Sequence, residues 1–377
     1  MIAPKGMWRY PLLAGLLLLT VGMPVLVSSR NSSLTLPATN DKALSEFGRQ
    51  RLPQTTAEVG AGHLSEPYRN VSCTPSARLN LHPRWAQGFV AHFAEEGFSQ
   101  DVVVCDSQGK QVSSAHIAIP GLSVFFLMAA VPTMEGAAIV SGLAMTNPGR
   151  TYFLAKTSSS GGIVSVIRTE GFQAGNVCEA SDHTIWTLGS DRDKEPKQDD
   201  NFALVQHYSF EKGLLHGYLS KTDSGLSDTH ALGVGFPGAG LLVCGKESIS
   251  LYLNDTNEYI QIDPVTETLK RWKMNEEPLP KGTFTGFAVT EKGRVYASLF
   301  EDWRTETDWK FRRGLFELRL EPNSGSGKWT VVNGTFTSLD PELVLDGIFF
   351  KLWGADGNDL VIRRLHEADM SWVRVIP

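Results

Sequence analysis

The feature that most constrains this fold is a recurring unit of two short apolar strands joined by a tight polar turn. The clearest copy spans residues 286–300, reads GFAVTEKGRVYASLF and turns at Lys292–Gly293. Related stretches lie at 175–188, 241–253 and 348–364. Turn residues between alternating apolar runs are typical of β-hairpins, so each stretch predicts a pair of antiparallel strands.

A second hairpin pattern accompanies the first. Its copies lie at 102–117, 204–219, 259–272 and 316–332. A four-stranded unit cannot bury both faces alone, whereas units packed radially in a closed ring can. We therefore predict an all-β fold, a β-propeller over residues 85–377, of six four-stranded blades, or five if the terminal strands share a blade. The expected units are 85–120, 121–170, 171–228, 229–278, 279–338 and 339–377.

Four segments carry a resemblance to a known group of proteins: 182–188 (DHTIWTL), 259–263 (YIQID), 286–299 and 355–359. In these strand–turn patterns the chain resembles uncharacterised secreted bacterial six-bladed propellers, which are distantly similar to NHL-type and gluconolactonase-type propellers. The resemblance covers residues 85–377 and implies a propeller fold. It implies no particular function, because one fold hosts many unrelated activities.

The N-terminus has the pattern of an export signal. Lys5 and Arg9 precede an apolar stretch at 12–27, and small residues follow at Ser28–Ser29. This order predicts a secretory signal peptide over 1–29, with an uncleaved membrane anchor as the alternative. Residues 30–84 are rich in polar residues without a sustained period, which predicts a flexible linker. We therefore expect a periplasmic or extracellular protein.

Composition limits the partners. The formal net charge is −6, and no Lys/Arg stripe stands out, so a nucleic-acid partner is not expected. Membrane contact is expected only through an uncleaved N-terminal anchor. The four cysteines lack metal-site or redox spacing. Cys105, Cys178 and Cys244 lie in or beside apolar runs and are expected to be buried thiols, with a Cys73–Cys105 disulfide as the alternative for Cys105.

Two long insertions lie between the second and third strands of their units, at 191–200 and 301–313. In a propeller such loops rise from one face, and loops on a rigid scaffold often carry binding residues. The second insertion interleaves aromatic and arginine side chains, which are frequent at recognition surfaces. The candidate ligand-binding residues are Asp191, Asp193, Trp303, Arg304, Trp309 and Arg312.

The sequence favours a binding or scaffold protein that contacts a protein, peptide or glycan through this loop face. The alternative is a metal-dependent propeller hydrolase or lactonase, with Asn176, Glu179 and Asp346 as candidate ligands at the central channel. No catalytic motif and no cofactor motif is present. His207 and His216 are expected at the surface or at a sheet edge. An enzymatic role is therefore less expected than binding.

Overall fold

Contacts within the computed structural model divide the chain into two compact units, Met1–Gln54 and Thr55–Pro377. All the described residues belong to the second unit. They are 84–86, 88–93, 100–106, 110–146, 149–192, 202–220, 240–253, 256–274, 283–304, 309–321, 324–331, 350–364 and 372–375. The predicted signal peptide and the predicted linker up to residue 83 lie outside them. Within these ranges no helix has the length and apolar character needed to cross a membrane.

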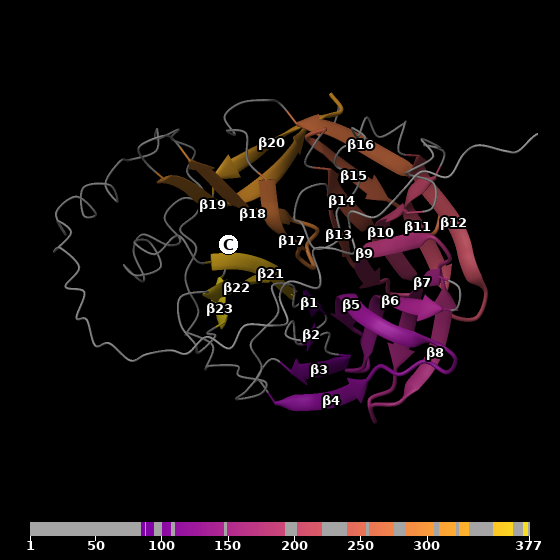
Figure 1. Cartoon of the computed structure of the whole chain (residues 1–377). Coiled ribbons are helices and arrows are strands. Elements are labelled where there is room, and N and C mark those ends of the chain that lie inside the picture. The colour runs from indigo at the N-terminus through magenta and orange to yellow at the C-terminus, as the bar shows by residue number, and fades with distance from the viewer. Residues whose placement is uncertain are drawn as a thin grey trace, which may run out of the picture. The chain divides into compact units, whose positions relative to one another are not determined.

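Every regular element of the described residues is a β-strand, and Figure 1 shows them as groups of neighbouring arrows. The strands are β1 (Arg84–Ala86), β2 (Phe89–Phe93), β3 (Asp101–Asp106), β4 (Gln111–His116), β5 (Ser123–Pro132), β6 (Ala138–Thr146), β7 (Gly149–Thr157), β8 (Ile163–Arg168), β9 (Phe172–Glu179), β10 (Ile185–Asp191), β11 (Ala203–Ser209), β12 (Gly213–Ser220), β13 (Gly240–Cys244), β14 (Ile249–Leu253), β15 (Glu258–Ile262), β16 (Leu269–Met274), β17 (Thr283–Val289), β18 (Val295–Arg304), β19 (Trp309–Glu321), β20 (Ser326–Val331), β21 (Phe350–Asp356), β22 (Asp359–Arg364) and β23 (Trp372–Val375).

These strands pair in sequence order as antiparallel neighbours. β1–β4, β5–β8 and β9–β12 form four-stranded sheets, and β21–β23 form a three-stranded one. β13–β16 and β17–β20 are joined into one eight-stranded sheet by a short parallel pairing of β16 with β20. The prediction of an all-β fold built mainly from four-stranded antiparallel units is confirmed.

Burial falls from the first strands of a group to the last, and the sequence explains why. The second strands β10 and β14 are buried along almost their whole length, and most of their residues are apolar or small. The last strands β4 and β16 are more polar, and most of their residues are exposed. A strand covered on both faces reads as a continuous apolar run, whereas a strand at a sheet edge does not.

Four apolar clusters fill the space between successive groups. They lie between β1–β4 and β5–β8, between β5–β8 and β9–β12, between β9–β12 and β13–β16, and between β13–β16 and β17–β20. Each cluster takes side chains from both of the groups that it joins. The groups are therefore held face to face by apolar burial, which is the main favourable term in folding.

The first strands of the groups contact one another in order along the chain. β1 and β2 contact β5, β5 contacts β9, β9 contacts β13, β13 contacts β17, β17 contacts β21, and β21 contacts β1. Buried hydroxyls add hydrogen bonds between groups: Ser113 Oγ donates to Gly136 O at 2.8 Å, and Ser141 Oγ donates to Ala174 O at 2.8 Å. The amide of Leu352 donates to Ser298 Oγ at 3.2 Å.

A row of side chains runs across the strands of the β9–β12 sheet, on the face that packs against β13–β16. Cys178, Trp186, His207 and His216 are paired in register on successive strands. Trp186 stacks on His207 with ring centroids 4.1 Å apart. The expected surface position of His207 is wrong, because its side chain is only 5% exposed. His216 lies at the outer end of the row and is about half exposed, as expected.

The N-terminal group, β1–β4, has more strands than its sequence shows clearly. The sequence around 89–96 is ambiguous between a helix and a strand, and only two strands of this unit are clear from sequence. The structure has β2 at Phe89–Phe93 and four paired strands in the group. The apolar run is too short to specify a period by itself, and pairing with β1 and β3 determines its conformation.

Candidate functional site

A cavity of about 550 Å³ lies where the first strands of the groups end. Its wall takes residues from the ends of β5, β9, β13, β17 and β21 and from the turn after β1. The apolar part of the lining includes Val131, Val177, Leu242 and Phe287, and the polar part includes Ser181, Lys246, Thr290 and Glu291. A concave site with an apolar wall and a few polar groups is typical of ligand pockets of this volume.

Hydrogen bonds between neighbouring hairpin turns fix the rim of this cavity. The Ser181 hydroxyl donates to Lys246 O at 3.4 Å, from the turn after β9 to the turn after β13. The amide of Glu291 donates to Gly357 O at 2.9 Å, from the turn after β17 to the turn after β21. The amide of Lys292 donates to the Asn358 side chain at 3.2 Å. The turns are thus tied to one another as well as to their own strands.

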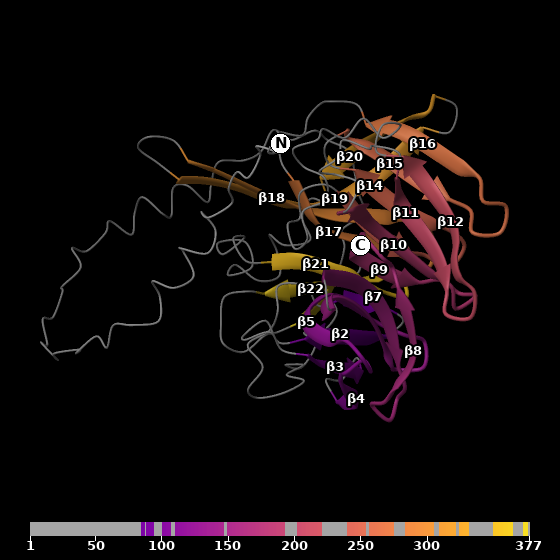
Figure 2. The same ribbon diagram turned by 45° about the vertical axis from the view of Figure 1, so that its right-hand side comes forward.

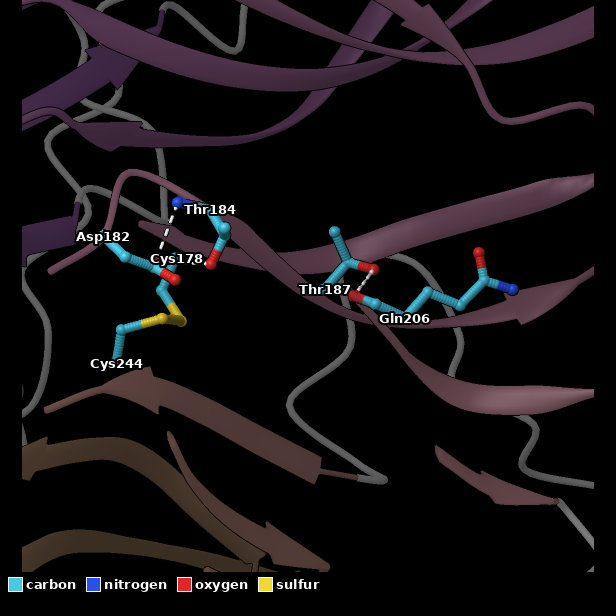
Figure 3. The surroundings of a disulfide bond; sticks show 6 residues. All are labelled: Cys178, Asp182, Thr184, Thr187, Gln206 and Cys244. Atoms are coloured by element: carbon cyan, nitrogen blue, oxygen red, sulfur yellow. Dashed lines mark hydrogen bonds between the residues drawn. A yellow bond between two sulfur atoms is a disulfide. The ribbon is translucent and has the colours of Figure 1, made fainter. Parts of the chain in front are cut away.

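A disulfide also lies in the wall, between Cys178 at the end of β9 and Cys244 at the end of β13 (Figure 3). Their Cα atoms are 5.6 Å apart, and 66 positions separate them in sequence. The expectation of buried thiols at these two positions is wrong, because the groups bring two strand ends together that are distant in sequence. Cys105 is also disulfide-bonded, and Cys73 lies outside the described residues.

The turn beside the disulfide is held by its own polar residues. The Asp182 carboxylate accepts hydrogen bonds from the Thr184 amide at 3.0 Å and from the Thr184 hydroxyl at 2.6 Å (Figure 3). His183, between them, has a φ of 65°, in the left-handed region that few non-glycine residues adopt. Asp side chains favour such turns because they bond the backbone two residues on. This conformation places His183 near Glu179.

Four ionisable side chains meet next to the cavity, between the turns after β5 and β9. The carboxylate of Glu179 is fully buried, lines the cavity and accepts a hydrogen bond from Met134 N at 3.1 Å. The Lys156 ammonium lies 3.3 Å from Glu179 and 3.8 Å from Glu135. His183 Nδ1 lies 3.3 Å from Glu179 and 3.4 Å from Glu135. The sequence singled out Glu179 but not its three neighbours.

The surroundings of Glu135 lower the pKa of its carboxyl. Partial burial by itself raises the pKa of its carboxyl. The Thr133 hydroxyl and the Lys156 ammonium oppose this effect, and the net pKa is below the ordinary value. The carboxylate of Glu135 is therefore negative at neutral pH, which makes it available to a cation.

A smaller polar cavity of about 380 Å³ continues from the rim between β13–β16 and β17–β20. It shares Lys246, Thr290 and Glu291 with the main cavity, and Asp263, Lys270 and Lys292 also line it. Acidic and basic side chains are balanced along this wall. The two cavities are therefore neighbours, and the smaller one is the more polar.

Five of the six residues predicted from the two insertions lie in β10, β18 and β19. Asp191 ends β10, and Asp193 lies outside the described residues. Trp303 and Arg304 end β18, and the next strand begins at Trp309 and includes Arg312. The register pairs Arg304 with Trp309 and Glu301 with Arg312. Among the described side chains, that of Asp191 does not line either cavity.

We call β18 and β19 from residue 301 to residue 313 the hairpin arm, which Figure 2 shows reaching beyond β17. The insertion is thus an extension of two strands rather than a loop without secondary structure. Its alternating residues favour this extension, because aromatic side chains have high strand propensity. A binding role for the arm stays a prediction.

Comparisons with known proteins give only distant likenesses. No family model matches the chain, and no curated protein matches it. Among solved structures, the chain is similar to a member of the DUF4221 family from Bacteroides vulgatus, at 9% identity and a TM-score of 0.47, over 85% of this chain and 97% of that one. It is also similar to the PQQ-bound aldose sugar dehydrogenase of Streptomyces coelicolor, at 11% identity and a TM-score of 0.43, over 85% and 99%.

A third similar structure is a protein of unknown function from Bacteroides caccae, at 12% identity and a TM-score of 0.42, over 67% of this chain and 80% of that one. The chain is therefore similar to uncharacterised Bacteroides proteins and to a sugar dehydrogenase. Likenesses this distant carry no information on the activity or the ligand of this chain.

Proposed function

We propose that this protein is an exported six-bladed β-propeller that binds a peptide segment of a partner protein in the cavity at its hairpin turns. Six groups of strands support the blade count, together with the contacts that run from β1 through the first strand of each group and return from β21 to β1. Radial packing of this kind leaves only short sheet edges at the periphery.

Export is supported by the cysteines and by the N-terminal sequence. Cys178, Cys244 and Cys105 are all disulfide-bonded. Disulfides persist in oxidising compartments and are rare in the reducing cytosol. The signal-peptide pattern at 1–29 is consistent with the same compartment.

The observation that carries the binding proposal is the cavity of about 550 Å³ with a rim tied by hydrogen bonds between turns. A rigid rim reduces the entropy lost on binding, because the site is already ordered. The apolar wall at Val131, Leu242 and Phe287 fits an apolar side chain, and the rim charges at Lys246 and Glu291 fit a polar backbone beside it. A peptide combines these two chemistries.

The test is selection of peptides from a random library on the purified protein, followed by binding measurements on two variants. Ser181→Trp places a large side chain at the exposed rim of the cavity. It is expected to weaken binding of the selected peptides at least tenfold. Ser160→Trp makes the same change at an exposed site in the turn after β7, away from the cavity, and is expected to leave affinity unchanged.

Selection of no peptide, or selected peptides that bind the Ser181→Trp variant as well as the wild type, would contradict the proposal.

The hairpin arm is proposed as a second contact surface of the same partner, through Trp303, Arg304, Trp309 and Arg312. The metal-dependent hydrolase stays an alternative prediction. Asn176 lies in β9, and Asp346 lies outside the described residues.

A further inference from the structure

Three side chains with metal-binding atoms converge beside the cavity: Glu135, Glu179 and His183. Their ligand atoms all lie within 4.8 Å of one another. His183 Nδ1 is 3.4 Å from one Glu135 oxygen and 3.3 Å from one Glu179 oxygen. The three residues come from two neighbouring hairpin turns and the end of β9, so the convergence depends on the packing of two groups of strands.

These distances match those between ligands of one tetrahedral ion. Zinc lies about 2.0–2.2 Å from imidazole nitrogen and carboxylate oxygen. Two ligands at that radius and a tetrahedral angle are about 3.4 Å apart. The two distances from His183 Nδ1 therefore already fit one ion, and the two carboxylate oxygens lie within 4.8 Å of each other.

The charge of the cluster points to a cation independently of the distances. Glu179 is a carboxylate with no exposed side-chain surface, and Glu135 adds a second negative charge beside it. Lys156 supplies one positive charge to both. The cluster therefore has two carboxylates and one ammonium. The excess negative charge lies beside the buried Glu179, and a divalent ion bound there would neutralise it.

The geometry points to a binding site for a divalent first-row transition ion such as Zn²⁺, with Glu135, Glu179 and His183 as ligands and with Lys156 displaced as the ion enters. An imidazole in a set of three protein ligands suits such an ion better than Ca²⁺, which takes six to eight oxygens. Three protein ligands leave one coordination position open. Since Glu179 also lines the cavity, the ion would lie at the cavity wall.

This inference goes beyond the proposed peptide binding and does not depend on it. Its test is titration of the chelator-treated protein with Co²⁺, followed by visible absorption and by displacement with Zn²⁺. One equivalent of Co²⁺ is expected to give a saturable spectrum that Zn²⁺ abolishes and that excess Ca²⁺ leaves unchanged.

Two variants each remove one ligand and leave the buried Glu179 unchanged. They alter Glu135 and His183, which are each about half exposed. Glu135→Gln and His183→Gln are each expected to weaken Co²⁺ binding at least about tenfold. Loss of a residue that only supports a metal ligand already weakens metal affinity by about that factor. Lys156→Met removes the competing ammonium and is expected to tighten binding.

The matched control is His216→Gln, which alters another half-exposed histidine beside a glutamate, Glu267, at 3.9 Å. It is expected to leave Co²⁺ affinity unchanged. Absence of a saturable spectrum in the wild type would overturn the site. Binding only by the Lys156→Met variant would also overturn it, because Lys156 would then be the permanent counter-ion. Equal losses in His183→Gln and His216→Gln would show non-specific binding and would have the same consequence.

Discussion

At the scale of single residues, His207 is a core histidine that meets almost no polar partner. Neither ring nitrogen has a hydrogen-bond partner among the described residues, and the ring stacks on Trp186. Burial lowers the pKa of its imidazole. The charges of Asp182 and Glu267 oppose this effect, and His216 adds to it. His207 is therefore held neutral in the folded protein.

This environment makes stability depend on pH. The folded pKa of His207 lies below its ordinary value of 6.5, so the unfolded chain takes up more protons as the pH falls through that value. The contribution of His207 to the free energy of unfolding is therefore fully present above pH 6.5 and is lost as the pH falls toward the folded pKa. His207→Phe keeps an aromatic ring against Trp186 and is expected to reduce this loss, measured by chemical unfolding at about pH 8 and about pH 5.

His116→Gln is the control for this measurement, because His116 is an exposed histidine beside Asp101. It is expected to keep the wild-type decline in stability. An equal decline in the His207→Phe variant and the wild type would contradict the assignment to His207.

At the scale of elements, the first strands approach one another closely enough to need glycine. Gly286 is the fourth residue of β17, and a Cβ there would lie 2.2 Å from the carbonyl oxygen of Leu352 in β21. Backbone cannot move aside as a flexible side chain can. This contact joins the last group of strands to its neighbour, so the glycine serves the packing between groups and not a turn.

Gly286→Ala is therefore expected to lower the free energy of unfolding by about 1–3 kcal/mol, the usual cost of overpacking. Gly175, the fourth residue of β9, is the matched control, because the nearest atom to its Cβ would be Leu188 O at 3.8 Å. Gly175→Ala is expected to change stability by less than about 0.5 kcal/mol. Equal unfolding midpoints for the two variants would rule out a close contact between β17 and β21.

At the scale of the whole molecule, the Cys178–Cys244 disulfide joins two groups of strands across 66 positions of sequence. A cross-link restricts the unfolded chain, and more so for a longer loop. It lies at the inner end of the Cys178, Trp186, His207 and His216 row, so it holds the two groups together at the cavity wall. The same interface also has the apolar cluster and the hydrogen bond from Ser181 to Lys246 O.

The double variant Cys178→Ser, Cys244→Ser is expected to lower the free energy of unfolding by about 2–4 kcal/mol. Both proteins are compared by chemical unfolding in the same oxidising buffer, so that the disulfide at Cys105 is intact in each. A variant as stable as the wild type would mean that the interface does not need the disulfide.

The sequence by itself determined the strands and their pairing into hairpins, because these depend on local alternation and on turn residues such as those at Lys292–Gly293. The predicted ranges from 85–120 to 339–377 each contain the strands of one group, except that β1 begins one residue earlier, at Arg84. Such patterns need no knowledge of distant residues. The strands of the hairpin arm were missed because its charged and aromatic residues also fit a loop.

Only the tertiary structure decided which residues meet. Nothing near Cys178 in the sequence identifies Cys244 as its partner, and nothing near His183 indicates Glu135. The cavity lies at the turns that follow the first strands, whereas the predicted site lies on the connections after the second strands. The physical reason is that side-by-side packing of the groups brings together strand ends far apart in the chain, and local patterns contain no information on that packing.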